Sequence, residues 1–191
     1  MTELVTPDVR WHESWAATIR EFGDEFPHGS GIGEGEVLEG REACEVFVAD
    51  RLRYSDPAQQ IEANRVHGDY FWITDGDQVI GFLALRHELN DWLLREGGHI
   101  GYSVRPSRRR EGHAGRALAL ALERARELGL DRVLLTCDED NVASRRTIEG
   151  GGGAYEDTRN GKQRFWIDVA PATAPGLPVS RARGGAGAGP A

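Results

Sequence analysis

The residues best suited to chemistry form a short arginine-rich loop near the middle of the chain. Three consecutive arginines, from Arg108 to Arg110, are followed by Gly112 and Ala114. Small residues let an anion approach the backbone, and the first N–H groups of a helix carry the positive end of its dipole. A guanidinium from Arg109 or Arg110 would add charge from the side. The loop is typical of a phosphate site, although a solvated basic helix start has the same composition.

The elements on either side of the loop favour the phosphate site. Ile100 to Val104 alternates bulky with small or polar residues, which predicts a strand, and Pro106 ends it. From residue 114 to 128, apolar residues recur at helical spacing, and Gly129 is a suitable stop. This order places a helix N-terminus directly at the arginines.

The loop resembles the pyrophosphate loop of the GNAT superfamily of N-acetyltransferases. That loop is usually written R/Q-x-x-G-x-G/A, and here it is Arg109-x-x-Gly112-x-Ala114. After a short buried-type strand at residues 133–137, residues 141–153 resemble the family's N-x-x-A/S…E-x-x-G-F/G helix. Two motifs in the family's order are far more specific than either alone, and the resemblance covers residues 68–169.

The resemblance implies the fold and the co-substrate. The fold is α/β (α+β): one domain over residues 1–169, with a central mixed, mostly antiparallel sheet, flanking helices and splayed central strands. The co-substrate is acetyl-CoA, without a metal. Backbone groups of the strand would pair with the pantetheine arm, and an amide near Val104 would stabilise the oxyanion. The cofactor-binding residues that carry over are Tyr102, Ser103, Val104, Arg109, Arg110, Gly112, His113, Ala114, Gly115, Arg116, Asn141 and Ser144.

The implied reaction moves an acetyl group to a primary amine by direct attack in a ternary complex. Since a neutral amine must attack, a base is needed. His99 is one candidate, at the strand start where many members place Glu; Glu88, with its neighbour His87, is another, in a polar run after an apolar strand. Water could also relay the proton.

One position departs from the family. Ile148 stands where many members have a Tyr that protonates the leaving thiolate. Either another group such as Ser144 serves, or the thiolate leaves unassisted, since its thiol has a pKa near 8.5. The departure keeps a non-catalytic CoA-binding module as the alternative function. Asn141 also suits a helix N-cap, and the two roles can coexist.

Composition excludes several classes. The 191 residues carry 23 Lys and Arg against 31 Asp and Glu, a net charge of −8, which argues against nucleic-acid and anionic-membrane partners. Cys44 and Cys137 have no paired spacing, so we expect neither a disulfide framework nor a cysteine zinc site. Without a signal peptide or a span of about 20 apolar residues, we expect a cytoplasmic protein.

The flanking segments carry fewer signals. An aromatic stripe through Trp11, Trp15 and Phe22 predicts a core helix. Residues 23–40 form an expected loop over the substrate site, and residues 170–191, rich in Pro, Ala and Gly, an expected disordered tail. The acceptor, a small-molecule or peptide amine, is left open, as is the oligomeric state, with a homodimer among the alternatives.

Overall fold

The computed structural model describes residues 1–33, 36 and 40–169. The predicted tail at 170–191 lies outside the described residues, as do residues 34–35 and 37–39 of the predicted substrate loop.

A seven-stranded sheet in the order β1-β2-β3-β4-β5-β7-β6 forms the centre of the fold. All neighbouring strands are antiparallel except β4 and β5, which are parallel. The predicted mixed, mostly antiparallel sheet is confirmed. The strands are β1 (Thr2–Val5), β2 (Gly68–Asp75), β3 (Gln78–Arg86), β4 (Ile100–Val104), β5 (Arg132–Asp138), β6 (Ala154–Arg159) and β7 (Lys162–Asp168).

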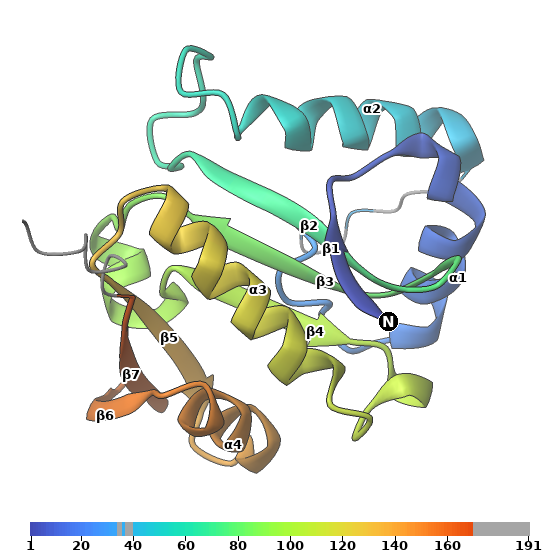
Figure 1. Cartoon of the computed structure of the whole chain (residues 1–191). Helices are drawn as coiled ribbons and strands as arrows, with labels where there is room; N and C mark the ends of the chain where they lie inside the picture. The colour runs from blue at the N-terminus through green and yellow to red at the C-terminus, as the bar shows by residue number, and fades with distance from the viewer. Residues whose placement is uncertain (34–35, 37–39, 170–191) are drawn as a thin grey trace, which may run out of the picture.

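Helices cover both faces of the sheet (Figure 1). The predicted helix after the arginine loop is present and starts one residue earlier than its apolar pattern, at His113. Short helical turns precede α1, β4 and α3, at Val9–Trp11, Leu93–Gly97 and Pro106–Arg108. The longer helices are α1 (His12–Phe22), α2 (Gly40–Arg53), α3 (His113–Glu127) and α4 (Val142–Gly150).

The two faces of the sheet have separate cores. On the face of α3 and α4, aliphatic residues such as Leu118 and Ile148 are fully buried. On the face of α1 and α2, the core is aromatic: Trp15 lies 5.9 Å from Trp72 and 5.5 Å from Phe47, measured between ring centroids. Trp15 and Phe22 of the predicted stripe are therefore core, because an amphipathic helix buries its large apolar residues against the sheet. Trp11 is partly buried and lies in the turn before α1.

The sheet opens between β4 and β5. Ile100 and Leu135 form the one register pair that joins these two strands. Figure 1 shows β5 diverging from β4, with β7 and β6 beyond it. The predicted splayed central strands are confirmed. The opening leaves backbone groups of β4 without a partner strand.

Candidate active site

The open edge of β4 presents backbone groups of Tyr102 and Val104. The Arg105 N–H and the His99 carbonyl bond across to β3, at 2.9 and 2.8 Å. In an antiparallel pair, alternate residues bond to the same neighbour, so residues 100, 102 and 104 face β5 instead. Because β5 has diverged beyond Ile100, the N–H groups of Tyr102 and Val104 are available to an extended ligand with amide groups.

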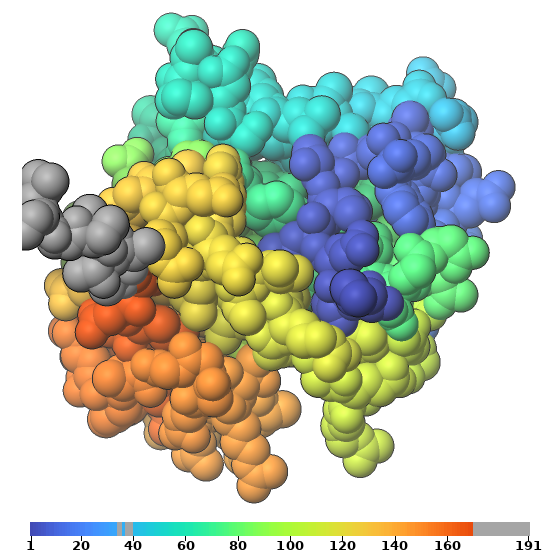
Figure 2. Space-filling view, in the orientation of Figure 1, coloured from blue at the N-terminus to red at the C-terminus, as the bar shows by residue number. Residues whose placement is uncertain are grey.

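The N-terminus of α3 lies beside the C-terminal end of β4. Gly112 is its N-cap, with a left-handed φ of 80° and no side-chain cap. The first intrahelical bond runs from the Arg116 N–H to the Gly112 carbonyl, at 3.1 Å. The N–H groups of His113, Ala114 and Gly115 therefore have no acceptor within the helix. Figure 2 shows the surface hollowed between this end of α3 and α4.

The Arg109 side chain is bound to protein groups in this structure. Its Nε donates to the Val104 carbonyl at 2.9 Å, and its Nη2 lies 2.6 Å from Glu25 Oε2. This pairing lowers the pKa of Glu25. Arg110 is exposed at a φ of 67° and has no bonding partner among the described residues. Arg110 is therefore the free cation of the loop, and Arg109 has to leave Glu25 to reach a phosphate.

His113 and Arg116 hold the loop to the first strand. His113 is 4% exposed, and its Nδ1 lies 2.9 Å from Thr2 Oγ1. Arg116 Nε donates to the same oxygen at 2.7 Å. Of the predicted cofactor residues, these two point their side chains at β1. His113 would therefore contact a ligand through its backbone N–H, whereas the Arg116 N–H is already bonded to the Gly112 carbonyl.

Helix α4 brings hydroxyl groups to the opening. Asn141 Oδ1 accepts the Ser144 N–H at 3.0 Å, which makes Asn141 the N-cap of α4. Ser144 Oγ lies 3.1 Å from Tyr102 Oη, and burial raises the pKa of Tyr102. Ile148 is fully buried in the core. A phenol from β4 therefore lies between β4 and α4, although α4 itself lacks one at residue 148.

His99 lies at the closed end of the opening. It is 6% exposed, and its Nδ1 accepts the backbone N–H of Leu134 at 2.9 Å. Burial and then the positive charge of Arg86 lower the pKa of His99 to about 4. The neutral ring thus carries its proton on Nε2, and its lone pair is already used by Leu134. This arrangement suits a structural histidine better than a base.

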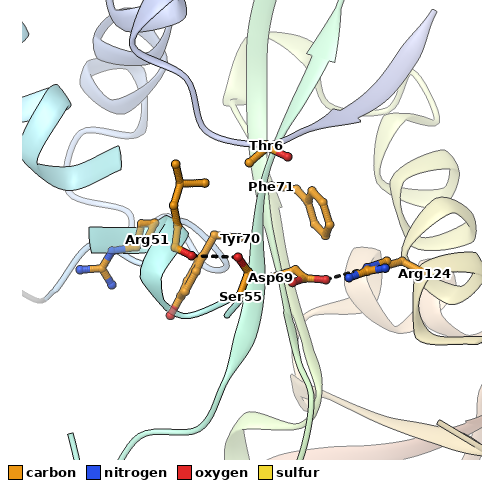
Figure 3. Close-up of a pocket in the computed structure, with 8 residues that line it drawn as sticks. Thr6, Arg51, Ser55, Asp69, Tyr70, Phe71 and Arg124 are labelled. Atoms are coloured by element: carbon orange, nitrogen blue, oxygen red, sulfur yellow. Dashed lines mark hydrogen bonds and ion pairs between the residues drawn. The ribbon is translucent and has the colours of Figure 1, made fainter. Parts of the chain in front are cut away.

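The polar run after β3 lies apart from the opening. Glu88 is exposed in a bend and has no bonding partner among the described residues. His87 Nε2 lies 3.2 Å from Asp69, whose other oxygen accepts Arg124 Nε at 2.8 Å. Asp69 and Arg124 line a cavity of about 280 Å³ between β2, α2 and α3 (Figure 3). One strand, β3, separates β2 from β4, so this cavity is distinct from the opening.

His28 and Arg86, which the sequence did not single out, lie on the other face of β4. Ser103 Oγ donates to the His28 carbonyl at 2.7 Å, which fixes the loop after α1 over the strand. Partial burial and then the charge of Lys162 lower the pKa of His28, while Asp138 opposes the change. The second residue is Arg86, at the end of β3. Two sequence signals could have indicated these residues: the length of the loop that carries His28, and the single arginine that ends the apolar strand β3.

Neither a metal-binding cluster nor a membrane-spanning helix occurs among the described residues. In the described part of the chain, no group of three or more His, Cys, Asp or Glu residues is placed to hold a metal ion. Within residues 1–33, 36 and 40–169, no helix is both long and apolar enough to cross a membrane. Cys44 and Cys137 are buried free thiols, and burial raises the pKa of both.

Comparison with known families decides the assignment. Residues 36–149 match the sequence model described as the acetyltransferase (GNAT) family, more than half of the chain. The chain belongs to the GNAT family of acetyltransferases. No curated protein matches it.

Solved structures of acetyltransferases share the fold. The Microcin C7 self-immunity acetyltransferase MccE, in complex with acetyl-CoA and AMP, superposes with a TM-score of 0.63 at 14% identity, covering 87% of this chain and 92% of that one. An acetyltransferase that modifies the N-terminal serine of a ribosomal subunit protein from Salmonella typhimurium gives 0.60 at 14%, covering 87% and 94%. Salmonella typhimurium yncA, with acetyl-CoA, gives 0.55 at 11%, covering 92% and 98%. At these identities the likeness concerns the fold alone.

Proposed function

We propose that this GNAT acetyltransferase moves an acetyl group from acetyl-CoA to a primary amine by direct attack in a ternary complex. The opening between β4 and β5, beside the uncapped N-terminus of α3, carries the proposal. The oxygens of a pyrophosphate would accept hydrogen bonds from the free N–H groups at Gly112 to Gly115, where the helix dipole favours negative charge. The amides of a pantetheine arm would pair with the open edge of β4 at Tyr102 and Val104.

The direction of the arm follows from these two contacts. Because the pyrophosphate site lies at the C-terminal end of β4, the arm runs back along the strand from Val104 towards Ile100. The thioester then lies beside Tyr102. An N–H group of Tyr102 or Val104 would donate to the oxyanion of the tetrahedral intermediate, and a fixed donor of this kind stabilises the developing charge without reorganisation.

The leaving thiolate would take its proton from the hydroxyl pair of Tyr102 and Ser144. The two oxygens are 3.1 Å apart and lie between β4 and α4. The phenol of Tyr102 would take the role of the Tyr that many family members have in α4 at the position of Ile148. A thiolate tolerates unassisted departure, because the pKa of its conjugate thiol is near 8.5, so this contribution is modest.

The base that deprotonates the amine is to be sought among His99, Glu88 and His28. His99 has its lone pair bonded to Leu134, and Glu88 is exposed beyond the end of β3. The His28 carbonyl accepts the Ser103 hydroxyl, so the loop that carries His28 lies over β4 on the face of α1 and α2. Its lowered pKa keeps the ring neutral at pH 7, as a base requires. These observations favour His28.

Two measurements test the proposal. Calorimetry measures CoA binding, for which we expect a micromolar dissociation constant. Thiol release from acetyl-CoA is then followed with a panel of primary amines, and mass spectrometry of the product locates the acetyl group. CoA binding without thiol release for any amine would instead support the non-catalytic CoA-binding module.

A further inference from the structure

Arg86 is a partly buried cation without a carboxylate beside it. Its Nη1 donates to the carbonyls of Gly97 and Gly98, each at 3.2 Å. Among the described residues it forms no ion pair. Burial lowers the pKa of Arg86, Tyr70 opposes the change, and repulsion from Arg65 adds to it. Its Nε and Nη2 make no hydrogen bond to the described residues and are not sealed from solvent. Two of its three nitrogens therefore have no bonding partner among the described residues.

The guanidinium faces the strand where the thioester is placed. A Cβ on Gly101 would lie 3.7 Å from Arg86 Nη1 and 3.7 Å from the backbone nitrogen of Gly29. Side chains alternate along β4, and Tyr102 packs towards the α3 face. Gly101 and Ser103 therefore face the other side, where the His28 loop lies. Arg86 thus borders the face from which an acceptor reaches the thioester.

Among the charged groups that act on His28 at this position, two are positive and one, Asp138, is negative. Arg86 lowers the pKa of both His28 and His99, and Lys162 acts on His28 in the same direction. A partly buried charge without a counter-ion is costly, and a bound anion relieves that cost. The planar fork of a guanidinium matches a carboxylate, with charge-assisted bonds roughly twice as strong as neutral ones.

We infer that the acceptor is a primary amine that also carries a carboxylate, and that Arg86 binds this carboxylate. The inference rests on the proposed function and narrows it. Because Arg86 lies beside Gly101 and the thioester beside Tyr102, amine and carboxylate are close together in the acceptor. Polyamines and aminoglycosides, which are polycations, would be repelled. The carboxylate belongs either to a free amino acid or to an acidic residue near a peptide N-terminus.

The experiment compares each amino acid with its amide, which keeps the amine and loses the carboxylate. Because the amide's amine is less basic, more of it is neutral at pH 7. A preference for the acid therefore cannot be due to the protonation state of the amine. We expect the acid to have a 10- to 100-fold higher kcat/KM, and Arg86→Gln to abolish that preference by raising KM for the acid alone. Peptides with an acidic second residue, paired with their amide counterparts, distinguish the two sources.

Control variants distinguish direct contact between Arg86 and the carboxylate from the effect of a nearby positive charge, and from a loss of folding. Arg65→Gln removes a nearby exposed charge and should retain the preference. Arg86→Lys keeps the charge without the fork and should give an intermediate preference. Melting temperatures establish that the variants fold. Binding of each acid and amide to the CoA-loaded protein, measured by calorimetry, gives the same comparison without turnover.

The outcomes are distinguishable. Equal binding and equal kcat/KM for acid and amide, or a preference that persists in Arg86→Gln, overturns the inference and leaves the proposed function intact. Failure of CoA to bind overturns the proposed function. Selective binding of the acid by the wild type alone still supports the role of Arg86.

Discussion

In the proposed site, the two faces of β4 would recognise ligands by different means. On the face of α3 and α4, the candidate groups are backbone N–H groups of the strand and of the first turn of α3. On the opposite face they are the side chains of His28 and Arg86, which come from segments far apart in the sequence, and the charge of Arg86 acts on the His28 ring. A backbone site depends on local conformation, which a short motif encodes. A side-chain site depends on which loops meet, which no short motif records.

The difference between a backbone site and a side-chain site also explains why the co-substrate is easier to infer from the sequence than the acceptor. A pyrophosphate needs a helix N-terminus and small residues, and both are contiguous at Gly112. In our proposal, the acceptor would meet a surface assembled from the loop after α1, the end of β3 and the start of β7. Changes at the first turn of α3 should therefore affect CoA binding, and changes on the acceptor face should affect turnover.

The largest effect is expected at Gly112. Gly112→Val forces a β-branched residue into a φ of 80° and places its Cβ 2.8 Å from Arg116 Nη1. It also blocks the approach of an anion to the first turn of α3. We expect CoA affinity, measured by calorimetry, to fall by about 100-fold or more, since several charge-assisted bonds of about 1.5–3 kcal/mol are lost together.

Gly129→Val is the matched control for Gly112→Val. Gly129 lies just beyond the other end of α3 at a φ of 77°, with no atom within 4 Å of an added Cβ. It carries the same backbone strain far from the phosphate site. An equal loss of CoA affinity in both variants would show that strain, and not the anion site, is responsible.

On the acceptor face, His28→Ala should lower kcat by about 100-fold with little change in CoA affinity, the lower end of the range for general bases. Its pKa lies below 6.5, so the wild-type rate should stay level near pH 7 and fall only as the pH drops through that lowered pKa. This acid limb should vanish in the variant. Glu88→Gln, which keeps the shape and removes the charge, should have a nearly wild-type profile; a large loss there would return the role to Glu88.

At the closed end of the opening, His99→Ala should act on stability. It leaves the Leu134 N–H buried without its acceptor, which costs about 1–3 kcal/mol. His99→Asn is the control, because its Oδ1 can replace Nδ1 as acceptor. Denaturant unfolding should show recovery of stability in the Asn variant. If both variants instead lose turnover by about 100-fold at wild-type stability, His99 is the base.

The pKa of His99 adds a pH signature to this test. The folded value is about 4, below the unfolded value of about 6.5, so the folded protein binds fewer protons between these pH values. The contribution of the neutral ring is complete above pH 6.5 and is lost as the pH falls towards 4. It amounts to at most about 3 kcal/mol and should be absent in both variants.

The smallest effect is expected at the hydroxyl pair of Tyr102 and Ser144, on the face of α3 and α4. Tyr102→Phe should lower kcat by about 10-fold, less than a general acid usually contributes, because a thiolate leaves readily. The CoA affinity should be nearly unchanged. Ser144→Ala shows which hydroxyl donates: a larger loss there than in Tyr102→Phe would identify Ser144 as the proton donor.

Much of the co-substrate face was determined by the sequence. The alternation at Ile100 to Val104 gave the bounds of β4, and Pro106 ended the strand as its missing N–H requires. Gly112 occupies a left-handed conformation that glycine adopts readily, and Asn141 caps α4. These features depend on dihedral preferences and on bonds within a few residues, so a single sequence contains them.

The tertiary structure alone decided the partners of the charged and titratable side chains. Thr2 holds His113 and Arg116 across 111 and 114 residues of sequence, and Glu25 reaches Arg109 across 84. His99 became a buried acceptor for Leu134 because β5 passes beside it. Burial and charge set whether a histidine can act as a base, and both come from segments that meet only when the sheet has formed.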